Sequence, residues 1–97
     1  DFEYEINWTY NGQPFITEPG SLTDAVAQAI LSTNGITTEL STSGGTSDAR
    51  FIAPTGAQVV ELGPINATIH KVNESTNIKQ LDELVDIFKL TLKNLLA

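Results

Sequence analysis

Residues 41–74, STSGGTSDARFIAPTGAQVVELGPINATIHKVNE, decide how this chain folds and contain its candidate site residues. The stretch holds two glycine-rich bends, one short apolar segment between them and the only histidine of the chain, His70. The residues before this stretch connect to it, and the residues after it are expected to form the last helix. We expect it to be one wall of an active site whose other wall lies outside this chain.

The first bend (residues 43–48) contains two adjacent glycines, Gly44 and Gly45. Glycine lets the backbone adopt positive φ and come close to a ligand. The next three residues, 46–48, are good N-cap types and predict a short helix over residues 49–53. Free N–H groups at such a helix start suit an oxyanion or a carboxylate. Taken alone, however, this pattern favours a plain turn before a helix.

The second bend (residues 63–74) follows an apolar strand expected over residues 58–62. In open α/β sheets, ligands bind at loops that leave the carboxyl ends of strands. His70 is a candidate metal ligand or general base, although a lone loop histidine is usually a surface or packing residue. Because a zinc site needs three or four ligands and the chain has no cysteine and no second histidine, His70 would need carboxylates or residues of another chain segment as partners.

The segments GGTSDARFIA (44–53) and GAQVVELGPINATIHKVNE (56–74) resemble the C-terminal part of the succinyl-diaminopimelate desuccinylase family. That family belongs to the di-zinc metallohydrolases of the aminoacylase and carboxypeptidase type. The resemblance runs from about Trp8 to the last helix. Ala49 stands where glycine is also common in the family, which is a mild departure.

The resemblance implies a role for four residues and for the whole chain. His70 would ligate one of two zinc ions, with cobalt as an alternative metal, Gly45 and Thr46 would contact the succinyl-bearing substrate, and Asn66 would contact substrate or product. The implied reaction cleaves N-succinyl-LL-2,6-diaminopimelate to succinate and diaminopimelate, in lysine and cell-wall precursor synthesis. The other zinc ligands and the catalytic glutamate have no match here, so we expect no catalytic residue in this chain and no activity of the chain alone.

Length and composition limit the classes of fold and function to which the chain can belong. The chain has 97 residues, no Cys and no Met, and begins at Asp1, so we expect a piece of a longer protein that makes one small domain. The formal charge of −7 argues against nucleic acid. The absence of cysteine excludes a disulfide framework and fits a cytoplasmic protein, and no apolar run is long enough to span a membrane. A free-standing module that binds an anion at the Gly44-Gly45 bend remains the alternative function.

Over residues 2–10, aromatic or apolar residues alternate with polar residues. This pattern predicts a half-buried strand with one solvent-exposed, acidic face. A proline-containing linker over residues 13–20 follows. The resemblance makes residues 1–14 the last strand of a dimerisation domain and residues 15–97 the C-terminal part of the catalytic domain. It therefore implies a homodimer, and we expect residues 2–10 at a contact between copies.

The rest of the chain predicts two longer helices. One begins at the cap residue Ser21 and ends at Gly35. The other covers residues 77–96, and Asn77 and Gln80 resemble a capping pair. Its apolar face comprises Leu81, Leu84, Val85, Phe88, Leu92 and Leu95, widened by Ile87 and Leu90.

With a further strand expected over residues 36–42, the predicted order is strand, helix, strand, short helix, strand, long helix. This order predicts an α/β fold. The resemblance implies the C-terminal portion of a three-layer α/β/α zinc-hydrolase catalytic domain, preceded by one strand from the dimerisation domain.

Overall fold

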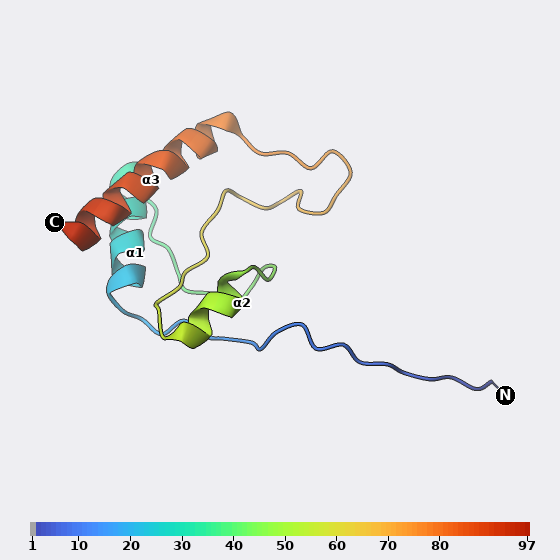
Figure 1. The fold of residues 1–97 in the computed structure, drawn as a ribbon. Helices are drawn as coiled ribbons and strands as arrows, with labels where there is room; N and C mark the ends of the chain where they lie inside the picture. Colours follow the sequence, from blue (N-terminus) through green and yellow to red (C-terminus); the bar gives the residue numbers. More distant parts are fainter. Residues whose placement is uncertain (1) are drawn as a thin grey trace.

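Two packed helices, α1 (Ser21–Asn34) and α3 (Ile78–Leu96), hold the buried part of the molecule (Figure 1). The structure is a computed structural model that describes residues 2–97. Between the two helices, the chain forms the short helix α2 (Ala49–Ile52), which the 3₁₀ turn η1 (Ala53–Thr55) continues. The predicted short helix over residues 49–53 and both longer helices are therefore confirmed.

The start of α1 is capped by a side chain from far along the sequence. Gly20, not the predicted Ser21, is the N-cap residue. The Gln58 side chain accepts a hydrogen bond from the Leu22 N–H (3.0 Å) and donates one to the Ser21 hydroxyl (3.0 Å). A Cβ atom at Gly20 would lie 2.7 Å from Gln58 Oε1. Glycine therefore leaves the space in which Gln58 satisfies one of the free N–H groups of the helix start.

The other helix ends are set by neighbouring residues. Gly35 ends α1 in the left-handed region (φ 71°), and its N–H donates to the Leu31 carbonyl (2.9 Å). Asn77 caps α3 by accepting the Lys79 N–H at 2.8 Å. The predicted capping partner Gln80 instead accepts the N–H of Ile65 (3.3 Å), which ties α3 to the second bend.

The core lies where α1 and α3 meet. Four buried residues form it, and four half-buried residues pack against them: Val26, Ala29, Ile30 and Ile87, with Leu22, Val60, Leu62 and Leu90. The apolar positions Ala25, Val26, Ala29 and Ile30 of α1 are thus buried. In α3 the buried positions are Ile87 and Thr91, whose hydroxyl donates to the Ile87 carbonyl (2.8 Å). Because α1 alone covers a narrow stripe, most of the predicted apolar face of α3 stays open to solvent.

That open face follows one line along α3. Its residues are each 38% to 58% exposed: Leu81, Val85, Phe88, Leu92 and Leu95. No sheet that could cover this face is present in the part of the chain that the structure describes.

The strands expected over residues 2–10, 36–42 and 58–62 do not form within residues 2–97. The hydrogen bonds of a strand run to a neighbouring strand, and none of these segments has a neighbouring strand among the described residues. Trp8 is 91% exposed, so the alternating pattern of residues 2–10 has nothing to pack against. The α/β fold and the three layers therefore stay a prediction.

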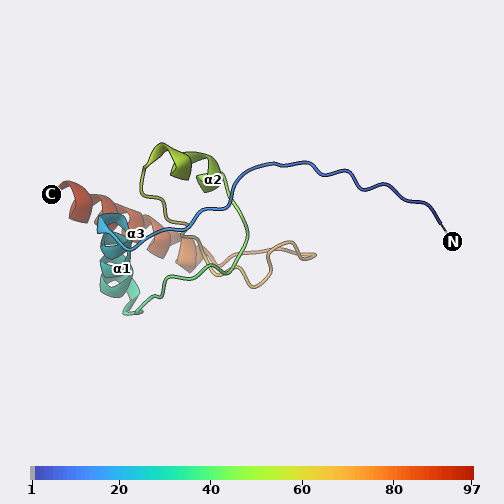
Figure 2. The ribbon, with the colours of Figure 1, turned by 90° about the horizontal axis from the view of Figure 1, so that it is seen from below.

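Residues 2–10 lead away from the helices in both views of the ribbon (Figures 1 and 2). The linker that follows lies against the segment after α2, because the Thr17 hydroxyl donates to the Val59 carbonyl (2.7 Å). The radius of gyration is 17.4 Å, against about 13 Å for a compact domain of this length. Within the described residues, neither long helix is apolar enough over a sufficient length to cross a bilayer.

Candidate functional site

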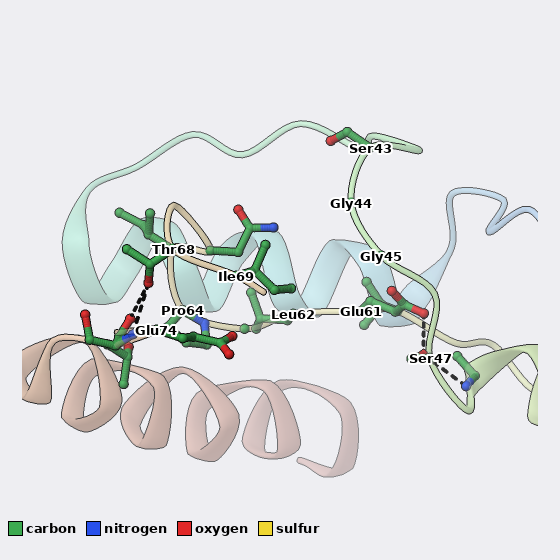
Figure 3. A pocket seen from close by; sticks show the side chains of 17 residues that line it. Ser43, Gly44, Gly45, Ser47, Glu61, Leu62, Pro64, Thr68, Ile69 and Glu74 are labelled. Carbon is green, nitrogen blue, oxygen red and sulfur yellow. Dashed lines mark hydrogen bonds between the residues drawn. The ribbon is translucent and has the colours of Figure 1, made fainter. Parts of the chain in front are cut away.

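The first and second bends line a single hollow of about 950 Å³ (Figure 3). Residues within the segment 43–49 line one side of it, and residues within the segments 60–69 and 74–76 line the other. These two segments come from before and after α2, which turns the chain back on itself. The two bends therefore lie next to each other, and their place in one wall of an active site stays a prediction.

The first bend needs glycine for its backbone. Gly44 has φ 107°, a conformation that residues with a side chain rarely adopt. A Cβ atom built on Gly44 or Gly45 would meet nothing within 4 Å, so the space above the bend is free for a ligand. Just before the glycines, the Ser41 hydroxyl donates to the Ser43 hydroxyl (2.8 Å) and accepts the Ser43 N–H (3.0 Å).

One side chain pair joins the two sides of the hollow. The Ser47 hydroxyl donates to a carboxylate oxygen of Glu61 (Figure 3). The same hydroxyl accepts the N–H of Ala49 at 3.1 Å, at the start of α2. Ser47 therefore connects the first bend to the short helix behind it and to the segment across the hollow.

The second bend is closed by another pair. The Thr68 hydroxyl donates to the Ser75 carbonyl (3.0 Å) and accepts the Ser75 N–H (3.0 Å), as Figure 3 shows. Between these two residues the chain makes successive turns, and His70 has φ 60°. A non-glycine residue with positive φ is uncommon. The two hydrogen bonds between Thr68 and Ser75, called the clasp below, therefore enclose a segment of unusual backbone. His70 lies in this segment on an exposed turn.

The structure brings two of the four predicted site residues into the hollow. Gly45 and Asn66 line it from opposite bends. Thr46 lies between the lining residues Gly45 and Ser47 and is exposed, and His70 follows the lining residue Ile69 and is exposed. Neither Thr46 nor His70 lines the hollow itself.

Sequence reasoning missed the pair of Ser47 and Glu61. Local patterns indicate Ser47 only as a good N-cap type and Glu61 only as part of an expected strand. No local pattern pairs them, because they are 14 residues apart and meet only when α2 turns the chain back.

Among residues 2–97, the charged side chains that line the hollow are the carboxylates Glu61 and Glu74, and no lysine, arginine or histidine lines it. Among the described residues, no cationic side chain in the hollow favours the alternative function, a module that binds an anion at the Gly44-Gly45 bend.

Within residues 2–97, no group of three or more His, Cys, Asp or Glu side chains is arranged to hold a metal ion. Imidazole is a common zinc ligand, so His70 fits a metal site as one ligand among several. The described residues do not supply a full ligand set.

Comparison with known proteins settles the family. A sequence model of the peptidase family M20/M25/M40 matches residues 3–94. The chain belongs to this family. Among its M20 relatives, the succinyl-diaminopimelate desuccinylase of Psychromonas ingrahamii is 75% identical over 94 residues, which make up 97% of this chain and 25% of that protein.

Two further relatives of the same name show similar coverage. The protein of Pseudoalteromonas atlantica is 61% identical over 97 residues, which are 100% of this chain and 26% of the relative. That of Acinetobacter baumannii is 59% identical over 95 residues, which are 98% of this chain and 25% of the relative. The chain thus spans about a quarter of the length of the curated relatives that it matches.

Proposed function

We propose that residues 1–97 form the C-terminal segment of a succinyl-diaminopimelate desuccinylase, which hydrolyses N-succinyl-LL-2,6-diaminopimelate to succinate and diaminopimelate. The observation that carries this proposal is the 75% identity over 97% of the chain, a span that includes both bends. The reaction serves lysine and cell-wall precursor synthesis, in a cytoplasmic homodimeric enzyme. The chain alone is inactive, because the catalytic glutamate lies elsewhere in the full-length protein.

The substrate contacts in this proposal are Gly45, Thr46 and Asn66. Gly45 and Asn66 face the same hollow from the two bends, and the space above Gly45 is open. An amide side chain both donates and accepts hydrogen bonds, so Asn66 can bind either a carboxylate or an amine of the ligand. Thr46, next to Gly45, extends the same contact surface.

The metal ligand in this proposal is His70, within a two-zinc site completed by residues outside the chain. Its exposed imidazole, on a turn held by the clasp of Thr68 and Ser75, is free to take a metal ion. When bound, zinc supplies a polarised carbonyl and an activated water for amide hydrolysis. The role of this chain is to hold the metal ligand His70 in place and to keep the two substrate-binding bends beside it.

The domain arrangement in this proposal assigns residues 1–14 to a dimerisation domain and residues 15–97 to the C-terminal part of a three-layer α/β/α catalytic domain. Residues 2–10 already lead away from the helices. The open apolar face of α3 needs cover, which a sheet layer of the catalytic domain would give.

The test is an assay of the full-length protein with N-succinyl-LL-2,6-diaminopimelate and zinc, with release of succinate as the readout. N-acetylated amino acids serve as comparison substrates, since other hydrolases of this type act on them. We expect turnover of the succinylated substrate in clear preference to the acetylated ones. Turnover of acetylated substrates alone would refute the substrate assignment, and no turnover of either would refute the proposed function.

A further inference from the structure

We propose that Glu61 is a positioning residue, whose carboxylate holds the Gly44-Gly45 bend in its binding position through the hydroxyl of Ser47. This inference rests on the proposed function, because it assigns the bend to substrate binding. It adds a residue that touches no substrate and acts through a hydrogen bond across the hollow.

In the described part of the chain, no other hydrogen bond joins the first bend to the opposite side of the hollow. Within residues 2–97, the bond from Ser47 to Glu61 is the only hydrogen bond between the segment 41–47 and the segment 60–76. The remaining hydrogen bonds of Ser41 and Ser43 are local. Two adjacent glycines lose more conformational entropy on ordering than other residues do, so this bend needs an external contact to stay in one conformation.

The donor and acceptor roles in this bond are unambiguous. A serine hydroxyl has one hydrogen to donate and two lone pairs. Ser47 gives its hydrogen to Glu61 and accepts the N–H of Ala49 with a lone pair. The backbone of Ser47 is thereby fixed from two directions, one and two residues from the substrate contacts Thr46 and Gly45.

Glu61 is itself attached to the rigid part of the molecule. Its neighbours Val60 and Leu62 pack against the buried cluster formed by α1 and α3. The hydrogen bond from Ser47 to Glu61 therefore links the first bend to the packed core. This relation depends on an acceptor oxygen at position 61 and does not depend on its negative charge.

The experiment uses the full-length protein and separates the acceptor from the charge. Glu61→Gln keeps an acceptor oxygen and removes the charge, whereas Glu61→Leu removes both at similar size. Ser47→Ala removes the donor. Glu39→Gln, at an exposed position outside the hollow, controls for the loss of one negative charge.

We expect Glu61→Leu and Ser47→Ala each to raise KM about tenfold, as loss of one hydrogen bond does, with a smaller effect on kcat. Glu61→Gln should stay within roughly twofold of the original protein, because the amide oxygen still accepts the bond. The double variant Ser47→Ala/Glu61→Leu should be no worse than either single variant, because both remove the same interaction.

Hydrogen exchange of the peptide that covers residues 43–48 gives a readout independent of turnover. It should be faster in Glu61→Leu and Ser47→Ala, and unchanged in Glu61→Gln and Glu39→Gln. Equal impairment of Glu61→Gln and Glu61→Leu would overturn the proposal in favour of a charge effect. Unchanged exchange and KM in Glu61→Leu would also overturn it. If the original protein releases no succinate, the proposed function fails, while the exchange data still decide whether Glu61 holds the bend.

Discussion

At the scale of single residues, His70 has the most unusual backbone among the candidate site residues. Its φ of 60° places it in the left-handed region, and the clasp of Thr68 and Ser75 closes the loop around it. A residue held in a sparsely populated conformation points to a functional constraint. The exposed imidazole at this turn agrees with a ligand that meets a metal held mainly by another part of the protein.

The first prediction concerns this side chain in the full-length protein. His70→Ala should remove most of the activity and about one metal equivalent per active site, because zinc loses a ligand. Metal content by elemental analysis and succinate release are the measurements. Lys71→Ala, a change at the next exposed residue, is the control and should leave both unchanged. Near-normal turnover and metal content in His70→Ala would rule out the ligand assignment.

At the scale of elements, the start of α1 depends on a partner from another segment. Gln58 lies 36 residues from Leu22, whose N–H it satisfies. Capping of this kind is normally done by the side chain of the N-cap residue itself. Here the cap is Gly20, which has no side chain, so the helix forms in full only when the segment after α2 is in place.

The second prediction tests this dependence. Gln58→Ala should cost about 1 kcal/mol at the first turn of α1, which corresponds to roughly fivefold faster amide exchange there. Gly20→Ala should also destabilise that turn, because the added Cβ would lie 2.7 Å from Gln58 Oε1.

The two changes should not be additive. In the Gln58→Ala background, Gly20→Ala no longer meets the glutamine side chain, so its effect should shrink. Hydrogen exchange of residues 21–24 in the full-length protein is the measurement. Additive effects of the two substitutions would show that Gln58 does not cap α1.

At the scale of the whole molecule, much apolar surface has no partner. The accessible surface is 8186 Å², against roughly 5,400 Å² for a compact monomer of this mass. Exposed large apolar side chains lie in residues 2–10, at Ile65 and Ile69 beside the hollow and along the open face of α3. Large exposed apolar patches mark sites of contact with other protein surfaces.

The third prediction is that residues 1–97 alone do not hydrolyse N-succinyl-LL-2,6-diaminopimelate. The physical reason is that the described residues contain no group of side chains that holds a metal ion, and the chain has one histidine. The measurement is succinate release by the purified chain with added zinc. Turnover above background, once contaminating full-length enzyme is excluded, would contradict this expectation.

The fourth prediction is that residues 1–97 alone associate into a dimer or a larger oligomer through residues 2–10. This segment exposes five large apolar or aromatic side chains: Phe2, Tyr4, Ile6, Trp8 and Tyr10. Edge pairing or exchange of the segment between copies would bury them.

Light scattering of the chain and of Trp8→Glu measures this association. We expect the substitution to lower the mass towards that of the monomer. A monomeric original chain at high micromolar concentration would refute the prediction. An oligomer whose mass Trp8→Glu leaves unchanged would place the contact elsewhere, with the open face of α3 around Phe88 as the next site to test.

The sequence by itself determined the helices and several of their ends. Gly35 stops α1 and Asn77 caps α3 because these signals act over a few residues. The bends and the short helix after the first bend were predictable for the same reason. The three expected strands were not decided locally, because a strand is held by hydrogen bonds to another segment.

Only the tertiary structure decided which distant residues meet. It placed Gly45 and Asn66 on one hollow, left Thr46 and His70 at its edge, and paired Ser47 with Glu61. It also selected the face of α3 around Ile87 for burial, although the sequence offered a wider apolar surface. These contacts depend on how the chain turns back at α2 and on the area that α1 covers, and no local pattern of residues encodes either.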